Sequence, residues 1–539
     1  MSTFGMTSPT DLTDRRTLNL VPPGTKLHSP GHRPGSDGPA RTLPMPSPPS
    51  PLSRGRERGD LKILVLLALL LSFGCAQPAE EGSESTEAAL AAPEVAPPGP
   101  FHQLALDVAA GLEAGAVEVE GAAPMWADDA NNPERIGTSL GSGVGGKVLF
   151  FLALHEATGD AAHLDAARRG ADHLLATLPE AVNAEAFPPA AGLFYGVAGT
   201  GMVLDRAHEA TGDARYREGA DRVLAMVSGA TLEGDEILWH PSFNDLLFGN
   251  AGALLYLVDA AEGLPADDPR RAETLDLATR VGQSLLARGF EDQGGLNWKF
   301  RQDTDFVLPN FSHGAAGIGF VLARLHQLTG EAEFLDGALG AGSYLRAIAD
   351  TADGGFRVPY GWPEPSWDGL HDVGWAHGPA GTARLFELLH QITGEASWRE
   401  LVLACGQSAL TSGMPGTPAA GYGDGPFPLD RRFGIAGVAD FMLDLYRLSG
   451  DAQHLDYARQ LTQHVRDQAV AEESGLVWEV PKAEGETPVR PTGLLSGAAG
   501  HGLLFLRLDA VERGLDTGIE DGLGLPDDPF ASSEETTDA

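Results

Sequence analysis

Cysteine is nearly absent from this chain of 539 residues, which contains only Cys75 and Cys405. Cys405 directly follows the apolar run 401–404, and we expect it to be a buried small hydrophobic residue. These positions exclude a disulfide within the folded part of the chain and a cysteine-rich metal cluster. A hydrophobic content of 42% is nevertheless sufficient for a large core.

Basic residues are also scarce. The chain has 37 Lys and Arg against 75 Asp and Glu, which gives a formal net charge of −38 at pH 7. This charge argues against nucleic acids and anionic membrane surfaces as direct partners, because like charges repel. It indicates no specific ligand, since acidic surfaces commonly serve solubility alone.

The apolar run 63–71 is too short to span a bilayer. It follows four basic residues and precedes a small residue and a cysteine, Gly74-Cys75. A basic segment, an apolar core and a small residue before the cut are typical of a secretory signal, and the Cys resembles that of a bacterial lipobox. We therefore expect residues 61–75 to be a lipoprotein-type signal peptide. The alternative is an ordinary signal peptide in which Cys75 is incidental.

Composition divides the remaining sequence. Residues 1–60 are rich in Pro, Ser, Gly and Arg and are expected to be disordered or a mis-called N-terminal extension. Residues 76–100 are predicted to be a flexible linker, and the acidic tail 516–539 to be disordered. The folded domain is expected over 101–515. These predictions describe an exported bacterial lipoprotein, periplasmic or on the cell surface, which touches the membrane only through a lipid on Cys75.

A Gly-x-x-Gly pair recurs seven times, each time at the start of a short apolar stretch. The pairs are Gly143/Gly146, Gly196/Gly199, Gly249/Gly252, Gly314/Gly317, Gly378/Gly381, Gly434/Gly437 and Gly497/Gly500. In five units a further glycine follows the second one by 13 residues, at Gly159, Gly212, Gly330, Gly394 and Gly450. Thirteen residues make about three and a half turns, so each unit predicts a helix that ends at the later glycine.

The helix that starts at each glycine pair is apolar on nearly every side, as in 318–323, and must be buried all round. The helix after it is amphipathic, as Leu455, Ala458 and Leu461 illustrate. Each unit thus predicts a helical hairpin. The long, irregular return connections favour a closed ring over an open solenoid. We predict an all-α fold, an α/α toroid of seven helical hairpins with seven inner helices around a central cavity and seven outer helices.

Polar residues just before the inner helices are expected to converge at one mouth of the ring. Asp245 precedes the third glycine pair, His313 the fourth, His377 the fifth and Arg432 the sixth. Because helix N-termini carry partial positive charge, the mouth should favour negative charge.

These segments resemble the lanthionine synthetase C-like (LanC-like) family, whose members are α/α toroids with a Gly-x-x-Gly motif at each inner helix. The most specific motifs are Asp245 ahead of Gly249, Ser312-His313-Gly314, and Trp375-x-His377-Gly378. The resemblance implies addition of a peptide's cysteine thiol to a dehydrated Ser or Thr, with zinc held by two Cys and one His.

The zinc ligands of the family are not present at the matching positions. Those positions hold Ala376, Arg432 and Phe433, so no cofactor and no zinc-dependent mechanism are expected. The resemblance matches Asp245 and His313 to the family's acid/base pair, in which a carboxylate orients a histidine. The alternative is that His313 bonds a loop carbonyl while Asp245 caps its helix.

Arg432 supports a further hypothesis, that Arg431 or Arg432 replaces zinc electrostatically and lowers the pKa of a bound thiol. The alternative is a solvated loop arginine. His377, beside the lost ligand, is a weaker candidate for chemistry. His371 and His501 are weaker candidates of the same kind, and each of the three could be an ordinary surface or loop histidine.

Three classes of function remain open for a cavity that takes a peptide or a small molecule. One is a zinc-independent, thioether-forming peptide-modifying enzyme, and another is a non-catalytic binding module, which export favours by separating the protein from cytosolic dehydratases. The third is a carbohydrate-processing toroid, because loop tryptophans lie near carboxylates that could flank a glycosidic bond. The residues concerned are Trp239, Trp298, Trp362, Trp367, Trp375, Asp303, Asp305, Glu364 and Asp368.

Overall fold

The computed structural model describes residues 97–515, apart from 184–188, 233, 235, 424 and 484, together with residues 524–530. The predictions for 1–60 and for the signal peptide 61–75, including Cys75, lie outside the described residues. So does most of the linker predicted over 76–100. None of the described helices is both long and apolar enough to cross a membrane.

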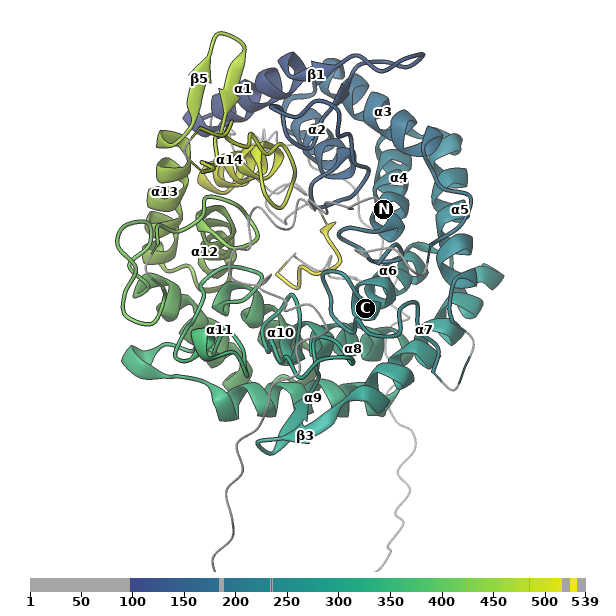
Figure 1. Cartoon of the computed structure of the whole chain (residues 1–539), viewed down its shortest axis with the longest axis vertical. Coiled ribbons are helices and arrows are strands. Elements are labelled where there is room, and N and C mark those ends of the chain that lie inside the picture. Colours follow the sequence, from purple (N-terminus) through teal and green to yellow (C-terminus); the bar gives the residue numbers. More distant parts are fainter. Residues whose placement is uncertain are drawn as a thin grey trace, which may run out of the picture. The chain divides into compact units, whose positions relative to one another are not determined.

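The described residues form two concentric rings of helices, as Figure 1 shows. The inner helices are α2 (Val144–Thr158), α4 (Val197–Thr211), α6 (Asn250–Gly263), α8 (Ala315–Thr329), α10 (Pro379–Thr393), α12 (Ile435–Ser449) and α14 (Ala498–Arg513). The outer helices are α3 (Ala161–Ala176), α5 (Ala214–Gly229), α7 (Pro269–Arg288), α9 (Ala332–Ile348), α11 (Ala396–Leu410), α13 (Ala452–Asp467) and α1 (Pro100–Ala114). The predicted all-α toroid of seven inner and seven outer helices is confirmed.

The seventh hairpin differs from the predicted arrangement. The repeat suggests a second helix after each inner one, but α14 takes its outer partner from the start of the domain, α1. The Phe101 and Phe505 rings are 6.1 Å apart, and Asp509 accepts the Gly99 N–H at 2.7 Å. Two segments distant in sequence therefore close the ring.

The five predicted stop signals end their helices as expected. Gly159, Gly212, Gly330, Gly394 and Gly450 all adopt the left-handed conformation, with φ between 68° and 73°. This is the position where glycine is favoured, because it has no Cβ to clash with the backbone. A histidine four residues earlier accepts the glycine N–H through its carbonyl in four of these helices.

The second glycine of each pair lies at a position where a Cβ has no room. At all seven, an added Cβ would meet the carbonyl oxygen of the residue six positions earlier, for example Trp375 at Gly381 and Phe311 at Gly317. The first turn of each inner helix therefore rests directly on the loop that precedes it, and this contact repeats around the ring.

We expect Gly381→Ala to destabilise the ring by about 1–3 kcal/mol, because the new methyl group overlaps the Trp375 carbonyl and approaches the Phe311 Cβ. Gly229→Ala is the control, since its Cβ would meet nothing within 4 Å at the end of α5. That change should be neutral or stabilising by up to ~1 kcal/mol. Denaturant unfolding of both variants measures the difference, and equal stability would contradict the stated role.

Backbone hydrogen bonds join the seven loops at the start of the inner helices. The residue two positions before the first glycine of a unit donates its N–H to the carbonyl of its counterpart in the next unit. Six such bonds of 2.8–3.0 Å run Leu247 to Ser312, Ser312 to Ala376, Ala376 to Arg432, Arg432 to Leu495, Leu495 to Gly141, and Gly141 to Phe194. These six bonds join the seven loops in an open series from Leu247 round to Phe194, and they help to fix the positions of the loop side chains.

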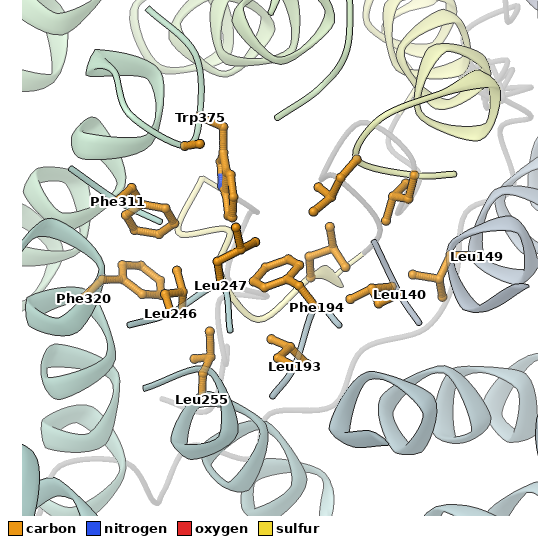
Figure 2. Close-up of a cluster of buried hydrophobic side chains, with 14 of the residues drawn as sticks. Leu140, Leu149, Leu193, Phe194, Leu246, Leu247, Leu255, Phe311, Phe320 and Trp375 are labelled. Atoms are coloured by element: carbon orange, nitrogen blue, oxygen red, sulfur yellow. The ribbon is translucent and has the colours of Figure 1, made fainter. Parts of the chain in front are cut away.

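Side chains fill the middle of the ring at this level, where a central cavity is predicted. The residue three positions before each first glycine is buried and points inward, as the labelled members in Figure 2 show. We call this set the hub: Leu140, Leu193, Leu246, Phe311, Trp375, Arg431 and Leu494. The hub separates the mouth, at the start of the inner helices, from the distal side of the ring.

Three short antiparallel hairpins decorate the loops between helices. They are β1 (Ala116–Val117) with β2 (Met125–Trp126), β3 (Phe290–Asp292) with β4 (Gly295–Asn297), and β5 (Val470–Glu472) with β6 (Gly475–Val477). Trp298 and Trp478, each directly after a hairpin, donate their indole N–H to the carbonyls of Leu285 and Val465 near the ends of outer helices, both at 2.8 Å. These rings seal the loop layer.

Candidate functional site

The residue directly before the first glycine of each pair lines the mouth. In five consecutive units it is an aromatic residue or a histidine, and we call this set the mouth arc: Tyr195, Phe248, His313, His377 and Phe433. Successive ring centroids are 5.3, 5.7, 5.1 and 5.7 Å apart. Backbone hydrogen bonds between adjacent loops join three of these four neighbouring pairs, and the five rings form a continuous aromatic wall.

Arg432 closes the arc across the mouth. Its Nη1 donates to the Tyr195 hydroxyl at 3.0 Å, and its guanidinium carbon lies 4.1 Å from the centre of the Phe433 ring. The side chain is buried with 4% of its surface exposed, so it is not a solvated loop arginine. The structure therefore brings together the four predicted site residues, Asp245, His313, His377 and Arg432.

Asp245 and His313 form a buried hydrogen-bonded pair. The Asp245 Oδ2 lies 2.7 Å from the His313 Nδ1, and the same oxygen accepts the Phe248 N–H at 3.2 Å. Asp245 is fully buried and His313 is 5% exposed. Asp245 therefore orients the imidazole, and the alternative in which His313 bonds a loop carbonyl is wrong.

The surroundings of the pair oppose charge on both groups. Burial, and then the nearby Arg432 guanidinium, lower the pKa of His313 to about 3. Burial also raises the pKa of Asp245 well above its usual value, against hydrogen bonds from the backbone. The imidazole is consequently neutral at pH 7, and Nε2 is the nitrogen left for a ligand.

The protonation state of Asp245 determines whether the His313 Nε2 accepts or donates a proton. With the carboxylate ionised, Nδ1–H donates to Oδ2 and Nε2 carries a lone pair. With Asp245 protonated, its carboxyl O–H donates to Nδ1, and Nε2 carries the imidazole hydrogen. The two states differ by one proton, which Nε2 gains from a bound ligand while the Nδ1 proton passes to Asp245. Taking up that proton converts His313 from a base into an acid, which is the chemistry required for proton transfer on a bound ligand.

His377 packs between aromatic rings. Its ring centre lies 4.5 Å from that of Tyr360, and it stacks on Phe433 with an angle of 2° between the planes. It is completely buried. Packing on both sides fixes this imidazole next to His313, where it shapes the wall of the site.

The residues at the family's zinc positions do not fit a zinc ion. Ala376 has no donor atom, Phe433 offers only a ring face, and the guanidinium of Arg432 would repel a cation. Across 97–515, outside the short gaps, and 524–530, no cluster of three or more His, Cys, Asp or Glu is arranged to hold a metal ion.

Three other predicted candidates lie away from the pair. Arg431 forms an ion pair with Asp440 on the distal side, so of the two adjacent arginines only Arg432 faces the mouth. The rings of His371 and His501 contact Tyr422 and Trp478, respectively. Cys405 is fully buried in the outer helix α11, as expected.

The tryptophans that suggest carbohydrate binding are mostly structural. Trp239 and Trp298 are buried and donate their indole N–H groups to the carbonyls of Val227 and Leu285. Trp375 belongs to the hub. Nearby, Asp303 pairs with Arg301 and Asp305 with Lys299, so these carboxylates already have partners.

A cavity of about 240 Å³ adjoins the arc. It lies between α3 and α4 and is lined by Thr138, Leu178, Tyr195, Gly196 and Thr200 among others. Tyr195 belongs to both the cavity and the arc. Tyr195, Phe248 and Phe433 are not among the predicted site residues, although all three occupy the position of His313 when the seven units are aligned on their first glycine.

Most of the chain matches the model of a known protein family. A family model described as lanthionine synthetase C-like protein matches residues 135–513. No curated protein matches the chain. The solved structure of a nisin cyclase is 15% identical, with a TM-score of 0.49, over 70% of this chain and 89% of that chain.

Two further solved structures are similar at lower scores. The Lin0763 protein from Listeria innocua is 13% identical, with a TM-score of 0.41, over 77% of this chain and 98% of that one. A family 76 glycoside hydrolase (mannosidase) from Bacteroides thetaiotaomicron is 14% identical, with a TM-score of 0.42, over 77% of this chain and 100% of that one. The family model covers most of the chain, and the chain therefore belongs to the lanthionine synthetase C-like family.

Proposed function

We propose that the mouth of the ring binds a peptide segment and that the Asp245–His313 pair transfers a proton on it without a metal ion. The observation that carries this proposal is the buried 2.7 Å contact between the two side chains, enclosed by the mouth arc. The 240 Å³ cavity beside Tyr195 offers room for a neighbouring part of the same peptide.

The proposed reaction is thioether formation, the addition of a thiol across the double bond of a dehydrated residue. The His313 Nε2 takes the thiol proton, and the sulfur forms a bond with the β-carbon. The electron pair of the double bond moves toward the α-carbon, which receives the proton back from Nε2. The proton count balances, and nothing is oxidised or reduced.

Arg432 supplies the fixed positive charge in this proposal. A cation near a thiol favours the thiolate and lowers the pKa of the thiol. Tyr195 and Phe433 hold the guanidinium in place, so the charge is available without reorganisation.

The test is incubation of the purified protein with peptides that carry a cysteine and a dehydroalanine, with loss of free thiol followed by alkylation and mass spectrometry. Wild-type turnover should persist in a chelator. Arg432→Ala should lower the rate by roughly tenfold or more, since removal of one preorganised charge commonly costs that much. Arg301→Ala, at a rim position paired with Asp303, is the matched control and should leave the rate unchanged.

Several outcomes would contradict the proposal. Complete loss of activity in chelator would contradict metal independence, and full activity of Arg432→Ala would remove the electrostatic role. Saturable peptide binding without thiol consumption would instead favour the non-catalytic binding module, which the substituted zinc positions also favour. Specific glycan binding without peptide binding would favour the hypothesis of a carbohydrate-processing toroid.

We further propose that the protein is exported and anchored by a lipid on Cys75. The support is the sequence of residues 61–75 alone. Cys75→Ala should release the protein from the membrane fraction, and mass spectrometry of the mature N-terminus should find a diacylated cysteine in the wild type. A mature N-terminus at another residue would contradict the anchor.

A further inference from the structure

Residues 524–530 lie inside the ring, on the distal side of the hub, where Figure 1 draws them in yellow near the centre. Composition predicts a disordered tail over 516–539, and for these residues the prediction is wrong. Leu525, Asp527 and Phe530 are buried, with 6%, 3% and 6% of their surfaces exposed. The acidic composition of the tail obscures its two buried apolar residues, Leu525 and Phe530. The basic partners of its carboxylates come together only in the closed ring.

The segment is held by side chains of three inner helices and the hub. The Asp527 Oδ2 accepts the Trp375 indole N–H at 3.0 Å, and the Asp527 carbonyl accepts from Arg384 at 2.8 Å. Gln391 donates to the Pro529 carbonyl at 2.7 Å. Further contacts are Arg206 to the Gly524 carbonyl at 3.3 Å, Arg384 to Asp528 at 3.4 Å, and the Phe530 ring 6.0 Å from that of Phe441.

The ring provides an excess of positive charge at this place before the segment binds. We call Arg384, Arg431, Asp440, Asp444 and Arg507 the distal ion cluster. It holds three arginines and two aspartates, and all five side chains are buried. Without residues 524–530 the cluster carries one net positive charge, and Asp527 and Asp528 add two negative ones. An acidic segment is therefore the electrostatically matched ligand.

The geometry also distinguishes this segment from the rest of the core. It pairs with no described strand and contains no α-helix. Inside the segment, the Asp528 N–H donates to the Leu525 carbonyl and the Phe530 N–H donates to the Asp528 Oδ1, each at 3.0 Å. Residues 516–523 join it to α14. Two arginines of the cluster keep partners without it, since Arg507 contacts Asp440 and Asp444, and Arg431 contacts Asp440. Arg384 instead forms its ion pairs with Asp527 and Asp528 of the segment.

We propose that the distal side of the ring is a binding site for an acidic peptide with a nearby aromatic residue, and that the chain's own residues 524–530 occupy it as a dissociable ligand. Arg384 pairs with the carboxylates of Asp527 and Asp528, and the Trp375 indole donates to Asp527. Phe530 packs on Phe441. This site lies across the hub from the Asp245–His313 pair and does not depend on the function proposed for that pair.

The test uses the full chain with a protease recognition sequence placed within 516–523, so that the ring folds intact before it is cut. After cutting and dialysis, fluorescence anisotropy follows binding of a labelled peptide with the sequence of 516–539. The peptide should bind saturably. Asp527→Asn and Asp528→Asn together in the peptide should weaken binding by about tenfold or more, because charge-assisted hydrogen bonds are lost.

Two controls separate this site from simple charge attraction. A peptide with Glu534→Gln and Glu535→Gln loses the same charge outside 524–530 and should bind as well as the parent peptide. In the protein, Arg384→Gln should weaken binding of the parent peptide by about tenfold or more, while Arg459→Gln on the outer helix α13 should not. Equal loss with both peptides would overturn the proposal.

Two further results would also overturn it. If the cut ring unfolds when its own segment is dialysed away, as circular dichroism would show, residues 524–530 are part of the core and not a ligand. If the ring stays folded and the peptide does not rebind, the distal side is no binding site. Rebinding with the expected order of affinities supports the proposal, whether or not the mouth proves catalytic.

Discussion

Replacing His313 with alanine is expected to slow thiol addition by roughly 10²- to 10⁴-fold, the usual contribution of a positioned general acid or base. The reason is geometric, because Nε2 is the ring nitrogen that the Nδ1 contact with Asp245 leaves for the ligand. Asp245→Asn keeps the size of the side chain but removes the proton that the pair exchanges, so it should also be strongly impaired. Single-turnover rates on a cysteine and dehydroalanine peptide measure both.

The double variant provides a sharper criterion. If Asp245 acts through His313, the double variant Asp245→Asn/His313→Ala should be no slower than His313→Ala alone, since residues that act as a unit are non-additive. His371→Ala is the control, because this residue contacts Tyr422 away from the pair and should keep the wild-type rate. Undiminished activity of a folded His313→Ala protein would refute the proton-transfer role.

Arg507→Met is expected to destabilise the protein by about 3–5 kcal/mol, the typical cost of leaving a buried charge without its partner. Arg507 has no exposed surface and contacts both Asp440 and Asp444, the latter at 2.6 Å. Despite Arg507, burial and then the charges of Asp528 and Asp440 raise the pKa of Asp444 to about 7. Removing the arginine therefore leaves too much negative charge in the middle of the ring.

Two controls accompany this variant in urea unfolding. Arg507→Met/Asp444→Asn removes one charge of each sign and should recover part of the lost stability, as coupled neighbours do. Arg168→Met breaks an exposed ion pair with Asp165 and should cost between zero and ~1 kcal/mol. If Arg507→Met proved as mild as Arg168→Met, the distal ion cluster would be irrelevant to stability.

Much of the fold could be predicted because it depends on short, local segments of the sequence. Each unit contains a glycine packed against a backbone carbonyl, an apolar stretch of fixed length and a left-handed glycine at the end of that stretch. These are properties of single units, and they recur in the sequence at regular positions. The same local register placed Asp245, His313, His377 and Arg432 at equivalent ends of their helices. Their convergence then followed from closing the ring.

The remainder could not be predicted because it depends on which loops face each other. Arg431 and Arg432 are adjacent, yet one enters the distal ion cluster and the other the mouth, according to their place before Gly434. The pairing of α1 with α14 joins the two ends of the domain. The filling of the hub by Phe311 and Trp375 depends on contacts between units.

The sequence by itself determined the seven inner helices, the six outer helices that follow them and their order around a closed ring, since spacing and glycine positions fix backbone conformation within each unit. Only the tertiary structure decided that apolar side chains fill the middle, that five rings form a wall beside the Asp245–His313 pair, and that residues 524–530 return to the distal side. These features arise from long-range packing and charge pairing, in which residues far apart in the chain become neighbours.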